Sequence, residues 1–329
     1  MFDWGWLPSE TFNVPVITVG NITTGGTGKT PHVEFLAEML TTKHYKVAVL
    51  SRGYKRKTKG YVLATKQSKV SDIGDEPFQL YKKFDRDIVL AVDEKRRRGI
   101  KNILKSYPDI DVIILDDAFQ HRYVKPALNL LLTDYYNLFT QDFILPTGNL
   151  REFRSSAKRA DLVIVTKTPY VFSPIDKDIM LKELRKFEGK SILFSYIDYG
   201  KLQPANSACQ KNHPTKIKTV ILLTGIANPA SLEEYIKRIS KDLYTLKYPD
   251  HHKYTEKDIE EIAEYYEDIF SGDKAIVTTE KDLMRLKDPR LMDLLSEIPL
   301  YYIPIKVKFH ENGEKELERI VMGLLNEDE

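Results

Sequence analysis

The sequence predicts an α/β protein built on a doubly wound, mostly parallel sheet, followed by a second, smaller α/β lobe. Short apolar runs alternate with amphipathic segments over roughly the first 200 residues, as expected for strands covered by helices on both faces. At 329 residues the chain exceeds the length at which one core usually stops growing, about 250–300 residues. A polar, turn-rich stretch at residues 199–218 separates two series of apolar runs and is the predicted linker.

Seven runs, most of them continuously apolar, predict the strands of the first lobe. They are Val14–Gly20, Val47–Ser51, Ile88–Val92, Val112–Asp116, Leu128–Thr133, Leu162–Thr166 and Ile192–Tyr196. Helices are predicted between several of them, because Val33, Leu36, Ala37 and Leu40 recur at helical spacing and the runs 94–106 and 174–187 are also amphipathic. Strands and helices alternating in this way are typical of a doubly wound sheet.

The remaining chain predicts a second α/β lobe and a final helix. Its predicted elements are strands at Val220–Thr224, Ala275–Thr278 and Leu300–Ile305, and helices at Ser231–Ile239 and Glu256–Phe270. The tail 314–325 carries Leu317, Ile320, Val321 and Leu324 at helical spacing. We therefore place the core at residues 1–205, the smaller lobe at 206–310, and at 311–329 a C-terminal helix that packs back on the core.

A glycine-rich loop follows the first predicted strand, in the stretch "VGNITTGGTGKTP". Phosphate-binding loops follow the pattern G-x-x-x-x-G-K-[ST], and this chain departs from it only at the first position, where Thr23 replaces glycine. A loop of this kind between a strand and a helix predicts a P-loop NTPase-like fold that binds the phosphates of a nucleotide. The predicted nucleotide-binding residues are Thr23, Thr24, Gly25, Gly26, Thr27, Gly28, Lys29 and Thr30.

Each part of this loop has a chemical role in holding a phosphate. Gly25 and Gly26 permit the backbone angles that turn successive N–H groups toward an anion, and the following helix adds the positive end of its dipole. Lys29 is expected to reach the β- and γ-phosphates, and the Thr30 hydroxyl to bind Mg²⁺. The alternative is a glycine-rich turn without a ligand.

Two carboxylates end a neighbouring buried strand in "DVIILDD". Asp116 and Asp117 follow four apolar residues, so they lie at the edge of the sheet where the phosphate loop is expected. One carboxylate can bind Mg²⁺ directly or through water, and the other can order the surrounding ligands. The alternative is that both side chains cap the next turn.

Charge and composition exclude several classes of protein. The net charge is only +2, which gives no general attraction to nucleic acid. Cys209 is the single cysteine, so an intramolecular disulfide is impossible and a reducing compartment, the cytoplasm, is expected. No apolar run approaches the ~18 residues of a membrane span. No obligate protein partner is indicated.

Several further motifs give a resemblance to the tetraacyldisaccharide 4′-kinase (lipid A 4′-kinase) family, over nearly the whole length. They are "VPVITVGNITTGGTGKTP", "SRGYKR", "GDEP", "DDAFQHR", "LPTGNLREF", "GIANP", "PDHHKYT" and "TTEKD", in this order. The resemblance implies a hinged two-lobe kinase that transfers the γ-phosphate of ATP to the 4′-hydroxyl of a tetraacylated glucosamine disaccharide 1-phosphate, a lipid A precursor. Two alternatives remain on the same core: a nucleotide-driven switch of the partitioning type, whose extra lysine is Thr24 here, and a soluble small-molecule kinase.

The resemblance also implies the catalytic residues. Asp75 of "GDEP" would act as general base, paired with His251 of "PDHH" from the other lobe, so that closing the hinge would assemble the site and exclude water. The residues alone favour Asp75 as a helix N-cap ahead of Pro77, and only the resemblance reverses this reading; nothing in the residues separates His251 from His252.

The motif "LREF" supplies two further candidates. Arg151 would neutralise the charge of the transferring phosphoryl group, with a surface salt bridge as the alternative reading. Glu152 and Gln120 would complete the magnesium shell. The chain departs from the usual motifs at two positions. Ala118 stands where the family often has glycine, and Phe153 stands where it usually has proline.

The implied place of action is the inner face of the bacterial cytoplasmic membrane. Family members carry a longer apolar segment before the first strand than the thirteen residues that precede Val14 here. Peripheral contact with the membrane surface would then depend on Trp4, Trp6 and the basic clusters Arg52–Lys59 and Lys95–Lys101, where each basic residue contributes ~1 kcal/mol near anionic lipid. Solvated helix faces explain the basic clusters equally well.

Overall fold

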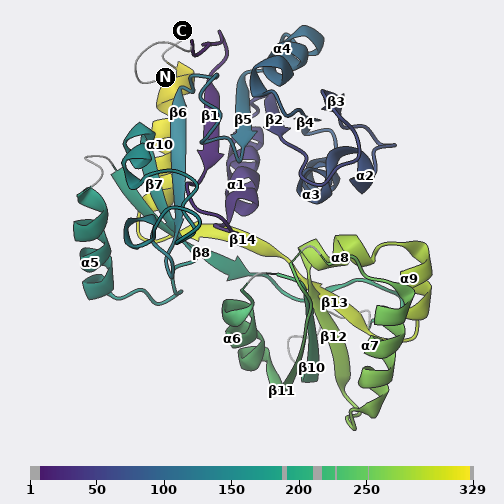
Figure 1. The fold of residues 1–329 in the computed structure, drawn as a ribbon. Helices are drawn as coiled ribbons and strands as arrows, with labels where there is room; N and C mark the ends of the chain where they lie inside the picture. Colours follow the sequence, from purple (N-terminus) through teal and green to yellow (C-terminus); the bar gives the residue numbers. More distant parts are fainter. Residues whose placement is uncertain (1–7, 187–190, 210–216, 227, 251, 327–329) are drawn as a thin grey trace. The chain divides into compact units, whose positions relative to one another are not determined.

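A computed structural model describes residues 8–186, 191–209, 217–226, 228–250 and 252–326. The chain divides into two compact units, of which unit 1 comprises Met1–Ile197 and Val307–Glu329 and unit 2 comprises Asp198–Lys306 (Figure 1). The sequence placed the corresponding limits at 205 and 310. Unit 2 is therefore inserted into unit 1, whose chain resumes after it.

Unit 1 contains a nine-stranded sheet in the order β14–β8–β7–β6–β1–β5–β2–β4–β3 (Figure 1). The strands are β1 Val16–Gly20, β2 Val47–Ser51, β3 Val62–Leu63, β4 Ile88–Val92, β5 Val112–Asp116, β6 Leu128–Asp134, β7 Leu162–Thr166, β8 Ser191–Tyr199 and β14 Ile305–Phe309. The pairs among β1, β2, β4, β5, β6, β7 and β8 are parallel, whereas β3 is antiparallel to β4. The predicted doubly wound, mostly parallel sheet is confirmed.

Helices cover both faces of this sheet. They are α1 Lys29–Thr42, α2 Val70–Ile73, α3 Asp75–Phe84, α4 Arg96–Ser106, α5 Pro174–Arg185 and α10 Gly313–Asn326, with 3₁₀ turns η1 Phe139–Gln141 and η2 Arg154–Arg159. Leu36 of α1, Leu80 of α3 and Leu317 of α10 belong to one apolar cluster. Ile100 of α4 lies in a second cluster and Leu184 of α5 in a third. The last helix is thus part of the core of unit 1.

The parallel arrangement brings the ends of several strands to one edge of the sheet. β1 lies between β5 and β6, and β2 follows β5. The residues that end β1, β2 and β5 are Gly20, Ser51 and Asp116. Ligands of open α/β sheets bind at this carboxyl edge, so the polar segments after these strands are the candidates for a functional site.

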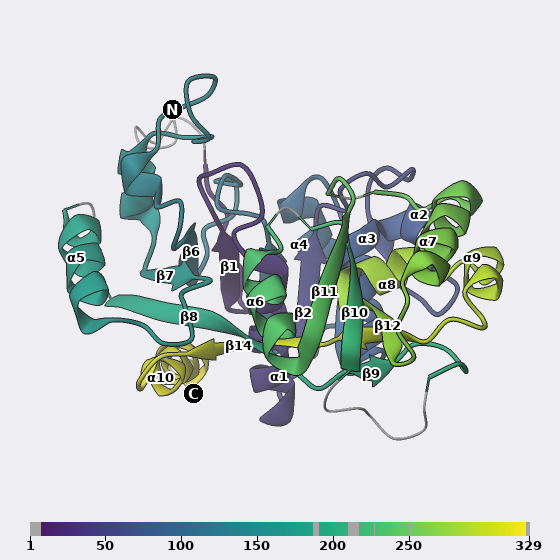
Figure 2. The same cartoon turned by 90° about the horizontal axis from the view of Figure 1, so that it is seen from below.

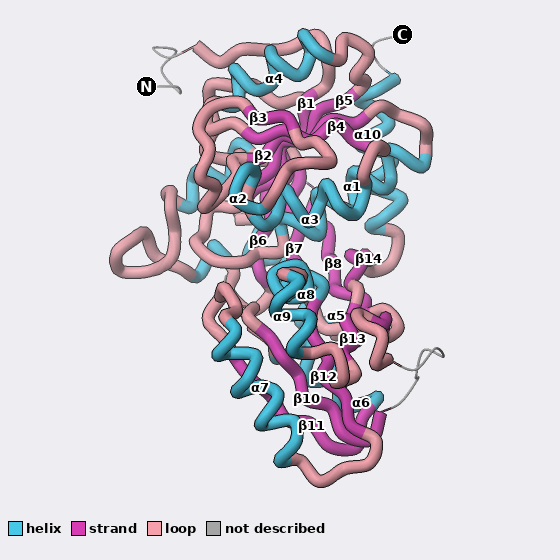
Figure 3. The backbone as a smooth tube through the Cα atoms, turned by 90° about the vertical axis from the view of Figure 1, so that its right-hand side faces the viewer, coloured by secondary structure: helices cyan, strands magenta, loops and turns pink. Residues whose placement is uncertain are grey.

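Unit 2 contains a five-stranded sheet in the order β11–β10–β12–β13–β9. Its strands are β9 Gln203–Pro204, β10 Ile217–Thr224, β11 Ser240–Lys247, β12 Lys274–Thr279 and β13 Leu300–Ile303, and its helices are α6 Ala230–Ile239, α7 Glu256–Asp268, α8 Glu280–Leu286 and α9 Pro289–Leu294. Helices α7, α8 and α9 share one apolar cluster, and α6 packs in another (Figures 2 and 3).

Two strands of this region differ from the sequence-based prediction. β11, with the sequence SKDLYTLK, was not predicted, because it is a half-exposed edge strand without an apolar run. The single strand predicted at 300–305 is broken at Pro304 into β13 and β14, which belong to different sheets. Proline lacks the N–H that a continuous ladder needs. None of the helices in the described ranges combines the length and apolarity needed to cross a bilayer.

Candidate active site

The glycine loop lies between β1 and α1 and faces open space. Gly28 is the N-cap of α1 with φ 83°, and Gly25 has φ 97°, values that favour glycine. A Cβ atom built on Gly25 or Gly26 would meet no atom within 4 Å. Room for an anion therefore exists beside the backbone N–H groups and the N-terminus of a 14-residue helix.

Side chains brace this loop from inside. The fully buried Asn21 donates hydrogen bonds from Nδ2 to Thr27 Oγ1 at 2.9 Å and to Thr23 Oγ1 at 3.3 Å. From β7, Thr166 Oγ1 donates to Thr27 O at 2.9 Å. Lys167, with φ 57°, donates from Nζ to Gly26 O and pairs with an acidic side chain of β6. The loop is consequently held in shape by the protein alone.

The buried His32 fixes the first turn of α1. Its Nδ1 lies 2.7 Å from Gly28 O and its Nε2 lies 2.9 Å from Ser195 Oγ. Burial, partly offset by the hydrogen bond to Gly28, lowers the pKa of His32 to about 4. The imidazole is therefore neutral at physiological pH and acts as a connector between α1 and β8.

Three charged side chains of the predicted site meet in front of the loop. Lys29 Nζ lies 3.6 Å from Asp117 Oδ1, and Arg151 Nη1 lies 3.5 Å from Asp117 Oδ2. Lys29 Nζ also lies 3.4 Å from Asn21 Oδ1. All three groups are partly exposed, so they remain accessible to a ligand. Asp117 adopts a left-handed backbone conformation with φ 45°, which a non-glycine residue rarely takes without support from its neighbours.

Asp116 lies deeper in the same edge. Its Oδ2 accepts a hydrogen bond from Ser51 Oγ at 3.0 Å, whereas its buried Oδ1 has no hydrogen-bond partner among the described residues. Burial, with the nearby charges of Glu76 and Asp117, raises the pKa of Asp116 to about 7, against the opposing effects of Lys29 and Ser51. A carboxylate oxygen left unpaired in this way is available to a cation.

The buried Arg96 donates hydrogen bonds to the backbone carbonyls of Asp93 and Asp116. It is only 2% exposed, and its two Nη atoms donate to Asp93 O at 2.5 Å and to Asp116 O at 2.9 Å. Burial, followed by the charges of Arg96 and Arg52, lowers the pKa of His121 to about 4, so this side chain is neutral beside Asp117. Arg96 belongs to a run expected at the surface, and its burial shows that this part of the basic cluster is structural.

Asp75 is the first residue of α3. The N-cap of this helix is Gly74, and no side chain makes the capping hydrogen bond, so capping does not explain Asp75. Gly74 has φ 92°, and a Cβ there would lie 2.8 Å from Tyr54 O. The loop after β2 is thus packed directly against the backbone that carries Asp75. The effect of Glu76 on the pKa of Asp116 places the start of α3 within electrostatic range of the aspartates.

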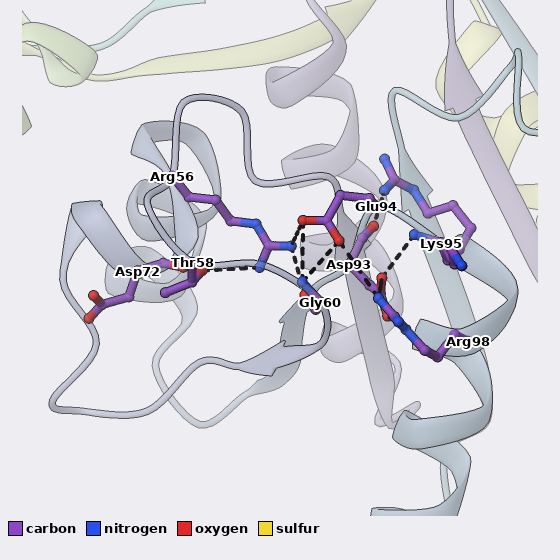
Figure 4. Close-up of polar contacts among 9 residues, drawn as sticks. Arg56, Thr58, Gly60, Asp72, Asp93, Glu94, Lys95 and Arg98 are labelled. Atoms are coloured by element: carbon purple, nitrogen blue, oxygen red, sulfur yellow. Dashed lines mark hydrogen bonds and ion pairs between the residues drawn. The ribbon is translucent and has the colours of Figure 1, made fainter.

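A polar network holds that loop in place (Figure 4). Arg56 Nη2 donates to Glu94 Oε1 at 2.5 Å and to Gly60 O at 2.7 Å, and Gly60 N donates to Glu94 Oε2 at 3.0 Å. Arg98 binds Asp93 through two hydrogen bonds of 2.9 and 2.7 Å. Two of the arginines in the basic clusters therefore neutralise acidic residues at the end of β4.

Gln120 and Glu152, two predicted magnesium ligands, have other partners. Gln120 Nε2 donates to Asn21 O at 2.6 Å and so joins the brace of the glycine loop. Glu152 Oε2 accepts from Arg159 Nη2 at 2.5 Å. The structure brings Lys29, Asp116, Asp117 and Arg151 together, whereas Glu152 pairs with η2. No group of three or more acidic, histidine or cysteine side chains suited to a metal occurs in the part of the chain that is described.

The motifs of unit 2 meet around a buried carboxylate. Asp282 is fully buried and accepts hydrogen bonds from Gly225 N at 3.0 Å and Arg285 Nη1 at 3.0 Å. A Cβ on Gly225 would lie 3.2 Å from Pro249 O, so this glycine permits the "PDHH" segment to approach. His251 lies outside the described residues. Its neighbour His252 contacts Asp258 Oδ2 at 3.1 Å through Nε2 and packs beside Tyr248.

Three residues of the site were not predicted from the sequence: Asn21, Ser51 and Arg96. Asn21 and Ser51 stand at or just after the carboxyl end of a buried strand, and this position was the available signal. Arg96 gave no such signal, because a run of basic residues looks alike whether one of its members is buried or all are solvated.

Comparisons with known proteins give relatives that match nearly the whole chain. The model of the family described as "Tetraacyldisaccharide-1-P 4'-kinase" matches residues 1–325. A tetraacyldisaccharide 4′-kinase of Bacteroides thetaiotaomicron is 45% identical over 100% of this chain and 89% of its own length. One of Flavobacterium psychrophilum is 44% identical over 98% and 90%. The crystal structure of LpxK from Aquifex aeolicus in complex with ATP superposes with a TM-score of 0.70 at 25% identity, covering 98% of this chain and 92% of that one.

Proposed function

Because this chain belongs to the tetraacyldisaccharide 4′-kinase family, we propose that the carboxyl edge of its large sheet binds ATP with Mg²⁺ and that Asp75 is the general base. The chain is a phosphotransferase that phosphorylates a tetraacyldisaccharide in lipid A biosynthesis. This activity decides against the two alternatives on the same core, the partitioning-type switch and the soluble small-molecule kinase.

The open glycine loop is the single observation that carries the nucleotide assignment. The loop borders open space at Gly25 and Gly26, because a Cβ on either glycine would meet no atom within 4 Å. The LpxK structure from Aquifex aeolicus was determined with ATP. Lys29 lies at the start of α1 and would contact the terminal phosphates, as the lysine of this motif does in other P-loop proteins.

The donors at this edge suit Mg²⁺. The ion prefers oxygen ligands and binds through one or two carboxylates, with water and substrate phosphates completing its shell. Asp116 offers a buried oxygen without a hydrogen-bond partner, and Asp117 and the Thr30 hydroxyl follow at the same edge. Bound there, the ion would neutralise charge on the terminal phosphates. Gln120 Nε2 and Glu152 Oε2 are engaged by Asn21 O and Arg159 Nη2, so each side chain would offer its other oxygen, Oε1, to the ion.

The chain's own residues provide the remaining chemistry. Asp75 would accept the proton of the 4′-hydroxyl as its oxygen attacks the γ-phosphorus and ADP departs. Lys29 and Arg151, which flank Asp117, would balance the charge that spreads over the phosphoryl oxygens. The role of His251 stays a prediction from the family resemblance.

A transfer assay tests the proposal. We expect labelled γ-phosphate to move to a tetraacyldisaccharide 1-phosphate dispersed in detergent and not to the deacylated disaccharide, with loss of transfer when Mg²⁺ is chelated. The Lys29→Ala protein should fold and lose transfer. Equal transfer to both acceptors, or full activity of Lys29→Ala, would contradict the assignment. The family's acceptor is a lipid, so we also propose peripheral attachment at the inner face of the cytoplasmic membrane.

A further inference from the structure

The connection between β6 and β7 exposes large apolar side chains at its tip. Figure 2 shows these two strands joined through a long teal loop. Phe143 is 61% exposed, Ile144 38%, Leu145 50% and Phe153 70%. Three of the four are consecutive. We call residues 142–150 the apolar loop.

Hydrogen bonds give this loop a fixed backbone. Asp142 Oδ1 accepts from Phe143 N at 2.8 Å and from Asn149 N at 3.1 Å. Phe143 O accepts from Leu150 N at 2.9 Å, and Leu150 O accepts from Leu145 N at 2.9 Å. These hydrogen bonds give the loop an ordered backbone, and the exposure of Phe143, Ile144 and Leu145 shows that their side chains face solvent.

A basic side chain lies beside the apolar tip, within a segment, 136–159, that contains four basic and two acidic residues. Two of these basic residues have acidic partners, Arg151 with Asp117 and Arg159 with Glu152. The guanidinium of Arg154 lies 5.2 Å from the centre of the Phe143 ring, and its Nε and Nη2 donate to Asp142 O at 2.9 and 2.7 Å. An apolar tip flanked by a positively charged side chain is complementary to an anionic lipid surface. The apolar groups can enter the membrane interface, and the cation can contact the anionic headgroups.

The same loop is hydrogen-bonded to the glycine loop. Thr24 N donates to Asn149 O at 2.7 Å, and Arg151 N donates to Ile22 O at 2.7 Å. Thr23 and Leu150 form an antiparallel bridge. Hydrogen bonds therefore connect the apolar loop directly to the glycine loop and to the backbone of Arg151.

We propose that the apolar loop docks on an anionic phospholipid bilayer, with Phe143, Ile144 and Leu145 inserted into the interface. This inference rests on the proposed function, because a kinase with a lipid acceptor must meet that lipid at a membrane surface. Docking through this loop sets the glycine loop and Arg151 at a fixed distance from the headgroups. A second copy of the chain is a less suitable occupant, because Arg154 would then face the same arginine of the other copy, and a partner protein would need an acidic side chain there.

The test compares a triple variant, Phe143→Ser/Ile144→Ser/Leu145→Ser, with the wild type. Binding is measured by co-sedimentation with vesicles of phosphatidylcholine, with and without phosphatidylglycerol. We expect the variant to lose about tenfold or more in partitioning to the anionic vesicles. Transfer to vesicle-embedded acceptor should fall in parallel, whereas transfer to detergent-dispersed acceptor and ATP affinity should stay at wild-type values. The matched control is Phe270→Ser, which removes a fully exposed aromatic side chain of unit 2.

The outcomes separate this inference from the proposed function. A wild-type protein inactive even on detergent-dispersed acceptor would refute the proposed function. Wild-type activity in detergent together with unchanged vesicle binding by the triple variant would overturn the docking role. A change in oligomeric state without a change in vesicle binding would overturn it as well. Should the triple variant unfold, Phe143→Ser alone is expected to lower vesicle partitioning measurably, and no change would again count against the inference.

Discussion

Arg151 Nη1 lies 3.5 Å from Asp117 Oδ2, so an arginine from the β6–β7 connection faces the carboxylate that follows β5. Asp117 also attracts Lys29 at 3.6 Å. A triphosphate placed on the glycine loop would compete with Asp117 for both cations. We therefore interpret this carboxylate as a placeholder that keeps the two cations oriented toward the position of the phosphates.

Replacing Arg151 with alanine should slow the chemical step rather than weaken nucleotide binding. An arginine that acts on the developing charge contributes mainly in the transition state, so we expect kcat to fall about 10²-fold or more while the Kd for ATP changes little. Steady-state kinetics and ATP titration measure the two effects. The control, Arg290→Ala, removes an exposed arginine of unit 2 that pairs with Asp288. A loss confined to ATP affinity would speak against this role.

Changing Asp75 to asparagine should remove the base and preserve the fold. Asparagine cannot accept the hydroxyl proton, so kcat should fall about 10²–10⁴-fold with ATP binding retained. Asp87→Asn, at an exposed position just after the same helix, should behave as wild type. If the Asp75 variant turned over at the wild-type rate, Asp75 would not be the general base, and another group would accept the proton of the 4′-hydroxyl. His251→Ala, assayed alongside, tests the role that the family resemblance implies for this histidine.

The buried Asp116 should make the ligand-free protein less stable as the pH rises. Its folded-state pKa of about 7 lies above the ordinary value, so folding favours the protonated form. That stability is fully present below the unfolded-state pKa, about 3.9, and is lost as the pH rises through about 7. Asp116→Asn should therefore exceed the wild type in free energy of unfolding at pH 8, by on the order of 2 kcal/mol, and approach it at pH 4. Urea titrations at both pH values measure the difference, and a constant difference would exclude the titration of Asp116 as its cause.

Acid should destabilise the protein through His32. Its folded-state pKa of about 4 lies below the ordinary value of 6.5, so the neutral imidazole stabilises the fold above pH 6.5. This contribution is lost as the pH falls from 6.5 to 4, up to about 3 kcal/mol. His32→Gln should be less stable at pH 7.5 but show a smaller decline over this range. Thermal melts of both proteins at several pH values test this prediction. If a group other than His32 caused the loss of stability in acid, the melting temperatures of the two proteins would fall in parallel.

Replacing Gly74 with alanine should lower the stability of the fold, whereas replacing Gly26 should lower the affinity for ATP. Gly74→Ala places a Cβ 2.8 Å from Tyr54 O at φ 92°, so we expect a loss of about 2 kcal/mol in stability and disturbance of Asp75. Gly26→Ala meets no neighbour within 4 Å, so the fold should persist while ATP affinity falls. Chemical denaturation and ATP titration distinguish the two. Equal stability of both variants would contradict the packing argument at Gly74.

The sequence predicted the fold where side-chain patterns follow the backbone period. β1 and β5 are continuously apolar because both faces are covered, and the glycine loop has a fixed pattern because only glycine adopts φ 83° at Gly28 without strain. β11 escaped prediction because an edge strand with one exposed face needs no apolar run. The transfer of the chain from β13 to β14 at Pro304 depends on which sheet accepts the next strand, and local sequence does not contain that information.

The site was predictable in its charged residues but not in their partners. Lys29, Asp116 and Asp117 stand in recognisable motifs, and the structure brings them to one edge. Burial of Arg96 within a basic run, and engagement of Glu152 by Arg159, depend on distant segments that pack there. Composition shows that charges exist but not which of them are neutralised inside the protein.

The insertion of unit 2 between two parts of unit 1 has a consequence for synthesis on the ribosome. Leu317 and Val321 of α10 belong to the same apolar cluster as β1 and α1, yet they are translated after all of unit 2. One face of the large sheet therefore stays partly uncovered until the last helix, α10, has left the exit tunnel and can pack on it. A chain released without residues 307–329 should engage chaperones and expose the glycine loop to protease, whereas unit 2, which ends at Lys306, would be complete.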